Sequence, residues 1–204
     1  MAVDKRILFG SLGAAVLISL GGGYALSRAD TGGSASSDDS IVTLSSAGTY
    51  NEPGIPTNAN VTGKKLPSAS FEDFGGNTIT TADLLSQSNG HPLVINVWNT
   101  SCEPCKRELP AFAKVHDDLG DAVRFVGIDA GDTASKSDVL AFATKYGLNY
   151  EDYRDPNGNL VTALGISGFP YTLFVTADGT IVAQKGIELT EDVIRSTIQS
   201  KLLS

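Results

Sequence analysis

The sequence has few of the residues that cross-link small domains or bind metals. Among 204 residues there are two cysteines and two histidines. Cys102 and Cys105 are only three positions apart, so they cannot supply the several cross-links of a disulfide-rich secreted fold. His91 and His116 are too few to complete a tetrahedral zinc site with them. We therefore expect no metal and no other cofactor, and a specific role for the two cysteines.

The chain also lacks an excess of basic residues. It has 15 Lys and Arg against 23 Asp and Glu, a formal net charge of −8. A protein that binds nucleic acid without sequence preference needs basic residues to displace counterions from the phosphates. The composition therefore argues against nucleic acid as a partner and favours a soluble, acidic surface.

One long apolar run is present near the N-terminus. Residues 7–26 carry no charge, and about twenty such residues span a bilayer core. Lys5 and Arg6 precede the run, so the positive-inside rule places residues 1–6 in the cytoplasm and the rest of the chain outside, attached to the cell membrane through a single span. The alternative is a signal peptide cleaved after Ser27 and Ala29, which would release a secreted protein.

A polar tether and one folded domain follow. Residues 27–60 are rich in Ser, Gly, Thr, Asp and Asn and show no apolar period, which is typical of a flexible linker. From Val61 onward strand and helix signals alternate, so residues 61–204 are expected to form one domain.

The order of these signals predicts an α/β fold. Extended segments at 66–71 and 78–80 flank the turn residues 75–77 and predict a hairpin, followed by a short helix at 81–87. Buried strands are expected at 92–98 and 122–129, with a helix at 102–119 between them. Helices at 135–147 and 157–165, strands at 171–176 and 180–185, and a helix from about 190 complete the pattern. This order implies a central mixed sheet with helices on both faces.

The two cysteines lie where a helix start can activate a thiol. Cys102 is in the turn between a buried strand and the next helix, whose unpaired amides stabilise a thiolate. Cys105, one turn into the helix, is expected to be more shielded. We therefore expect Cys102 to attack a partner disulfide and Cys105 to resolve the mixed disulfide.

Two segments resemble a known family. The sequences WNTSCEPCKRELP, from Trp98, and GISGFPYTLFV, from Gly165, are similar to the thioredoxin-fold family, most closely to its membrane-anchored extracytoplasmic branch typified by ResA and TlpA. The resemblance covers about residues 66–203. It implies that Pro110 lies inside the active-site helix. It also implies that Pro170 is a cis-proline opposite the cysteines, where the backbone of Phe169 pairs with a substrate strand.

The resemblance also suggests further site residues. Glu108 matches a glutamate that ResA-like proteins carry near the shielded cysteine, where a partly buried carboxylate takes the proton from Cys105; the alternative is a surface glutamate paired with a base. Glu103 and Pro104, between the cysteines, are expected to contact the substrate. Trp98 is expected either to contact the substrate or to belong to the core.

The sequence also departs from the family pattern. Asn96 occupies the position where cytoplasmic thioredoxins carry a buried aspartate, which leaves Glu108 as the expected base. Ser101 replaces the tryptophan that commonly precedes the first cysteine, so the partner-binding surface is expected to differ.

The leading functional hypothesis is a thiol–disulfide oxidoreductase that reduces protein disulfides outside the cytoplasm. The resemblance implies apocytochrome c as substrate and a membrane electron donor that reduces the pair again. The same chemistry run in reverse gives a disulfide-forming oxidase that uses an electron acceptor. A metal carrier, a peroxidase and a non-catalytic tethered interaction domain are the alternatives of other classes. Glu103 opposes the stabilisation of a Cys102 thiolate by the helix start, which favours a reducing pair.

Overall fold

The computed structural model describes residues 57–204. The expected membrane span at 7–26 and nearly all of the expected tether at 27–60 lie outside the described residues. Within residues 57–204, no helix is long and apolar enough to cross a membrane. The elements are, in order, β1 (Ser70–Glu72), β2 (Thr78–Thr80), α1 (Thr81–Gln87), β3 (Leu93–Trp98), α2 (Glu103–Leu119), β4 (Arg124–Ala130), α3 (Lys136–Lys145), β5 (Glu151–Asp155), α4 (Asn159–Leu164), β6 (Tyr171–Val175), β7 (Ile181–Lys185) and α5 (Glu191–Lys201).

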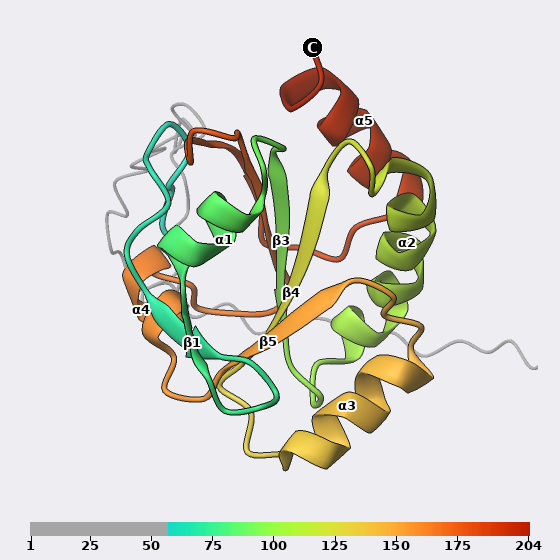
Figure 1. The fold of residues 1–204 in the computed structure, drawn as a ribbon. Helices are drawn as coiled ribbons and strands as arrows, with labels where there is room; N and C mark the ends of the chain where they lie inside the picture. Colours follow the sequence, from blue (N-terminus) through green and yellow to red (C-terminus); the bar gives the residue numbers. More distant parts are fainter. Residues whose placement is uncertain (1–56) are drawn as a thin grey trace, which may run out of the picture. The chain divides into compact units, whose positions relative to one another are not determined.

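The strands form one mixed sheet in the order β2-β1-β5-β4-β3-β6-β7 (Figure 1). Strands β3, β4 and β5 are parallel, whereas β6, β7, β1 and β2 are each antiparallel to a neighbour. This confirms the central mixed sheet that the sequence predicts.

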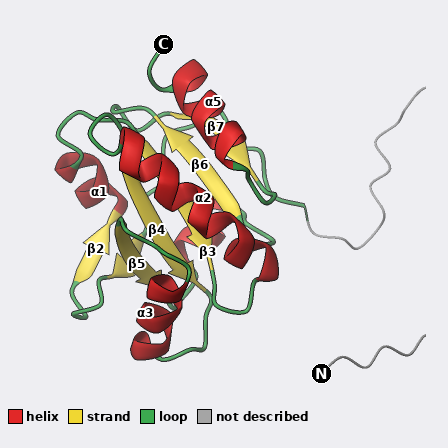
Figure 2. Cartoon of the chain, turned by 90° about the vertical axis from the view of Figure 1, so that its right-hand side faces the viewer, coloured by secondary structure: helices red, strands yellow, loops and turns green. Residues whose placement is uncertain are grey.

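Each face of the sheet has its own helices. Because side chains alternate along a strand, Leu93, Ile95 and Val97 of β3 enter the core formed with α1 and α4, and the intervening residues face α2, α3 and α5. Figure 2 shows these three helices in front of the sheet. Helix α2, which begins just after Cys102, thus covers the face that carries Asn96 and Trp98.

The N-terminal hairpin is confirmed, with shorter strands than expected. β1 and β2 pair with Phe71 opposite Ile79, and residues 66–69 precede β1 without belonging to it. The preceding residues also contact the domain: Ala59 N–H donates to Gly165 O at 3.1 Å, and Ser167 N–H donates to Asn58 Oδ1 at 2.7 Å. The contacts of the domain therefore begin before Val61, inside the stretch assigned to the tether.

Strand β5 was not expected from the sequence. Its residues, Glu-Asp-Tyr-Arg-Asp, are so polar that they resemble a loop. Its two most buried residues are paired: Arg154 Nε donates to Asp129 Oδ2 at 3.0 Å, and the Asp155 carboxylate accepts the N–H groups of Asn159 and Leu160 at the start of α4. Paired polar groups can be buried at little cost.

Candidate active site

The turn after β3 places Cys102 at the N-cap of α2. Its backbone is extended, with φ −80° and ψ 105°, and its Sγ accepts the N–H of Cys105 at 3.1 Å. Sulfur thus occupies the position that a serine or aspartate oxygen takes in an ordinary N-cap. A thiolate formed at Cys102 would lie at the positive end of the helix dipole.

The two cysteines form a disulfide with an S–S distance of 1.99 Å and a Cα–Cα distance of 5.3 Å. Their surroundings differ: Cys102 is half-buried, while Cys105 is 0% exposed and packs with Trp98 and Leu109. The asymmetry expected from the sequence is therefore present in the geometry. Only Cys102 offers a surface that a second protein can reach.

The residues between the cysteines are at the surface. Glu103 is exposed and its carboxylate accepts a hydrogen bond from Lys106, which holds the pKa of Glu103 below its usual value. Pro104 is half-buried in the first turn, where its fixed φ and missing N–H suit a helix start. The pairing with Lys106 reduces the opposition of Glu103 to a thiolate at Cys102.

Glu108 is buried one turn beyond Cys105. It is 1% exposed, its Oε1 accepts from Asn96 Nδ2 at 2.8 Å, and its Oε2 accepts the N–H of Leu189 at 2.9 Å. Desolvation raises the pKa of Glu108 to about 7, and the hydrogen bonds from Asn96 and Leu189 act in the opposite direction. The alternative of a surface glutamate is wrong. A carboxyl that exchanges its proton near neutral pH is suited to general acid–base chemistry.

The role of Asn96 was not apparent from the sequence. Its buried amide donates both to Glu108 and, at 3.2 Å, to Thr172 Oγ1. A polar residue inside the apolar run 92–98 was the available signal, because a buried amide needs a partner.

Trp98 requires a correction. Its side chain is 0% exposed and its ring stacks on Phe142 of α3, with centroids 5.1 Å apart. A fully buried indole cannot contact a substrate, so the core alternative is right and the substrate-binding alternative is wrong. Trp98 instead packs against Cys105 from within the fold.

Phe169 and Pro170 lie in the loop before β6. The peptide bond between them is cis, as the family resemblance implies. Phe169 is half-buried and packs against the same cluster as Cys102, the one formed around Trp98 and Cys105. The structure therefore brings the loop before β6 and the dithiol into contact with the same cluster.

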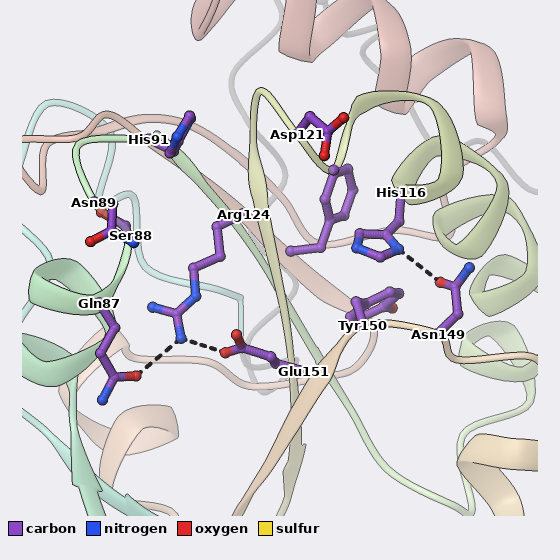
Figure 3. Close-up of a pocket in the computed structure, with 12 residues that line it drawn as sticks. Gln87, Ser88, Asn89, His91, His116, Asp121, Arg124, Asn149, Tyr150 and Glu151 are labelled. Carbon is purple, nitrogen blue, oxygen red and sulfur yellow. Dashed lines mark hydrogen bonds and ion pairs between the residues drawn. The ribbon is translucent and has the colours of Figure 1, made fainter.

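A pocket of about 500 Å³ lies elsewhere (Figure 3). It is lined by Arg124 and Glu151, the first residues of β4 and β5, and by His91 and His116. In the parallel register Arg124 pairs with Leu93 at the start of β3, whereas the cysteines follow the end of β3. The pocket is thus at the opposite end of the strands, and its charged Arg124 is already held by Glu151 and Leu84 O.

Comparison with known proteins assigns the family. A sequence model of the AhpC/TSA family matches residues 62–184, more than half of the chain. The chain belongs to this family of thioredoxin-like proteins. The matched residues of this chain include both cysteines, Glu108 and the loop before β6.

Individual members of the wider family are similar along most of their length. The chain is 30% identical over 133 residues to the thiol-disulfide oxidoreductase ResA of Bacillus subtilis, covering 65% of this chain and 71% of that protein. It is 30% identical over 149 residues to the thiol:disulfide interchange protein DsbE of Pseudomonas fluorescens, covering 72% and 78%. A secreted Mycobacterium tuberculosis disulfide oxidoreductase homologous to E. coli DsbE superposes with a TM-score of 0.56 at 25% identity, covering 64% of this chain and 94% of that one.

These relatives and the CxxC disulfide agree on the reaction class. The chain is a thioredoxin-like thiol–disulfide oxidoreductase of the ResA/DsbE type, as the sequence predicts.

Proposed function

We propose that this chain reduces disulfide bonds of proteins outside the cytoplasm, with Cys102 as the nucleophile and Cys105 as the resolving thiol. The observation that carries the proposal is the difference between the two sulfurs. Cys102 is half-buried at a helix start with an amide N–H directed at its Sγ, and Cys105 is fully enclosed. An exposed thiolate attacks readily, whereas an enclosed thiol reacts only with the neighbour to which the helix holds it.

The reaction then runs in two balanced steps. The Cys102 thiolate attacks one sulfur of the substrate disulfide, a mixed disulfide forms, and the other substrate sulfur leaves as a thiolate. The Cys105 thiolate next attacks Cys102 Sγ, the Cys102–Cys105 bond forms, and the second substrate sulfur leaves. Two electrons pass from the dithiol to the substrate.

Glu108 serves as the base in the second step. As a carboxylate it takes the proton of Cys105, and its burial one turn along the same helix keeps water from competing for that proton. Asn96 and the N–H of Leu189 hold the carboxyl in one orientation.

The substrate binds over the rim of the dithiol. It would contact exposed Glu103 and half-buried Pro104, which follow Cys102, and the loop with Phe169 and Pro170, in which Phe169 packs against the same cluster as Cys102. An extended substrate segment beside Phe169 would pair with backbone groups of that loop.

The place of action follows from the N-terminal sequence. Residues 7–26 anchor the protein in the cell membrane, residues 27–60 act as a tether, and the domain from 61 to 204 works on the extracytoplasmic side. The family resemblance of WNTSCEPCKRELP and GISGFPYTLFV leads us to propose apocytochrome c as the substrate and a membrane protein as the electron donor.

Trapping tests the assignment of the two sulfurs. A Cys105→Ser chain should accumulate a mixed disulfide with an oxidised peptide that carries the C-x-x-C-H haem-attachment motif. A Cys102→Ser chain, the matched control, should form none. Equal trapping by both variants would show that the two cysteines do not have the assigned roles. Equal rates with a scrambled disulfide peptide would show that apocytochrome c is not the preferred substrate.

A further inference from the structure

A row of polar positions crosses the sheet beneath α2. The strand register sets Thr172, Asn96, Gly127 and Asp152 side by side on β6, β3, β4 and β5. Glu108 of α2 contacts this row at Asn96, which donates the hydrogen bond described above. The row therefore leads from Glu108 to Asp152, a carboxyl for which the proposed reaction has no role.

The groups along this row are short of partners. Within residues 57–204, both carboxyl oxygens of Asp152, Oδ1 of Asn96, Nε1 of Trp98 and the hydroxyl of Tyr150 are buried without a well-formed hydrogen bond. A carboxylate in such a place is strongly disfavoured, whereas the neutral acid is tolerated. Desolvation raises the pKa of Asp152 to about 8, and the charge of Asp129 raises it further, whereas the N–H groups of Tyr153 and Trp98 and the charge of Arg154 act in the opposite direction.

Glycine at position 127 is what lets these groups meet. A Cβ at Gly127 would stand 2.5 Å from Asp152 Oδ1 and 3.1 Å from Trp98 Nε1. The carboxyl and the indole N–H therefore converge over the glycine. Trp98 and Cys105 belong to one buried cluster, so the side chain that meets Asp152 over Gly127 is also part of the surroundings of the resolving cysteine.

The surrounding charged groups favour a neutral Asp152. Asp129 of β4 is a second buried carboxyl, held at 3.0 Å by Arg154 of β5, and desolvation raises its pKa to about 7. Asp132, in the loop after β4, adds negative charge beside Asp129 and accepts the N–H of Thr100 at 2.6 Å. Arg154 supplies positive charge to this group, and Asp129 is its direct partner.

Tyr150 is the titratable group near Asp152 that also contacts α2. Desolvation raises the pKa of Tyr150 well above its usual value, and the charges of Asp152 and Glu108 raise it further. The hydroxyl therefore stays neutral while lying within electrostatic reach of both carboxyls. His116 of α2 packs on the ring of Tyr150, with centroids 5.6 Å apart, and its Nδ1 faces Asn149 rather than the row.

We propose that Asp152 is a positioning residue of the dithiol reaction, a second buried carboxyl that keeps its proton while Glu108 ionises and so lets Cys105 form a thiolate. This inference rests on the proposed function, in which Cys105 resolves the mixed disulfide. Cys105 gives its proton to Glu108, the thiolate attacks Cys102 Sγ, the substrate leaves as a thiolate, and Asp152 stays protonated throughout. A charge on Asp152 would disfavour the Cys105 thiolate through Trp98.

The test uses the full chain with Asp152→Asn and, as a matched control, Asp192→Asn at an exposed position of α5. Stopped-flow resolution of a mixed disulfide is measured from pH 6 to pH 9. At pH 6 both variants should match the wild type, because Asp152 is then neutral. Above pH 8 Asp152→Asn should resolve about three- to tenfold faster than the wild type, as expected for removal of one nearby charge.

A second readout is independent of catalysis. Trp98 is the only tryptophan, so its fluorescence should change near pH 8 in the wild type and in Asp192→Asn, and not in Asp152→Asn. If Asp152→Asn loses the fluorescence transition but resolves the mixed disulfide with the same pH profile as the wild type, the role of Asp152 is overturned and the proposed function stands. A wild-type chain that resolves no mixed disulfide would overturn the proposed function itself.

Discussion

At the scale of single residues, Glu108 differs from an ordinary glutamate because its side chain is buried. Burial between α2 and the sheet raises the pKa of Glu108 to about 7, against an ordinary value of 4.5. A base must be ionised to act, so the wild-type rate of resolution should rise between pH 6 and pH 8. The hydrogen bonds from Asn96 and from the N–H of Leu189 hold the Glu108 carboxyl in place.

Glu108→Gln should slow resolution at pH 8 by about tenfold or more and remove the rise between pH 6 and pH 8. Stopped-flow kinetics with a preformed mixed disulfide measures this. Gln loses one of the two hydrogen bonds that the carboxylate accepts, so the free energy of unfolding should fall by about 1–2 kcal/mol while the fold remains. Glu191→Gln, at the start of α5 where the carboxylate pairs with Arg195 and lies in a different helix from the cysteines, is the control. The same rate and pH profile as the wild type would show that Glu108 has only a structural role.

At the scale of the elements, the packing of side chains from β3 and β5 over β4 depends on the absence of a side chain at Gly127. The close approach of Asp152 and Trp98 leaves no room for a Cβ there. Gly127→Ala should therefore lower the free energy of unfolding by about 1–3 kcal/mol, the usual cost of overpacking. Gly168→Ala, where a Cβ would meet nothing within 4 Å, should change it little. Equal urea midpoints for the two variants would show that the core relaxes around the added methyl group.

The elements also show what the sequence can predict. Apolar runs such as 92–98 and 171–176 identified β3 and β6, because continuous apolar residues are typical of strands buried on both faces. β5 escaped prediction because its burial depends on long-range partners, chiefly Arg154 with Asp129. The cysteine pair and Glu108 were predicted from local spacing and family resemblance. The link through Asn96 to Thr172 and the approach of Asp152 to Trp98 arise from strand pairing, which local patterns do not contain.

At the scale of the whole molecule, three carboxyls with raised pKa values set how stability depends on pH. Desolvation raises the pKa of Glu108 and Asp129 to about 7 and that of Asp152 to about 8. In the unfolded chain these groups lose their protons near about pH 4. Between these values the folded domain binds more protons, so its free energy of unfolding falls as the pH rises. Asp178, whose pKa Lys65 holds well below its usual value, affects stability only at lower pH.

The oxidised protein should therefore be more stable at pH 5 than at pH 8, by on the order of a few kcal/mol. Urea unfolding at the two pH values measures the difference. The double variant Glu108→Gln and Asp152→Asn should flatten the dependence, since it removes two of the three groups. A free energy of unfolding that stays level or increases between pH 5 and pH 8 would contradict the assignment of neutral buried carboxyls.

The direction of electron flow is also a property of the whole molecule, because it depends on how far the fold stabilises the reduced form. Strong oxidants have a nucleophilic thiol with a pKa near about 3.5, five units below a free cysteine, which corresponds to about 7 kcal/mol. The helix start at Cys102 supplies about 0.5–1 kcal/mol. The pairing of Glu103 with Lys106 removes an opposing charge at the surface but adds no buried positive group. We therefore expect thiolate stabilisation to be far smaller than in an oxidase.

The reduction potential of the Cys102–Cys105 pair tests the reductase most directly. Equilibrating the protein in glutathione buffers of known ratio and quantifying the oxidised fraction gives this potential. We expect a value nearer to about −270 mV, the level of thioredoxin, than to about −120 mV, the level of DsbA. A potential above about −180 mV, the level of protein disulfide isomerase, would contradict the reductase and favour an enzyme that introduces disulfides.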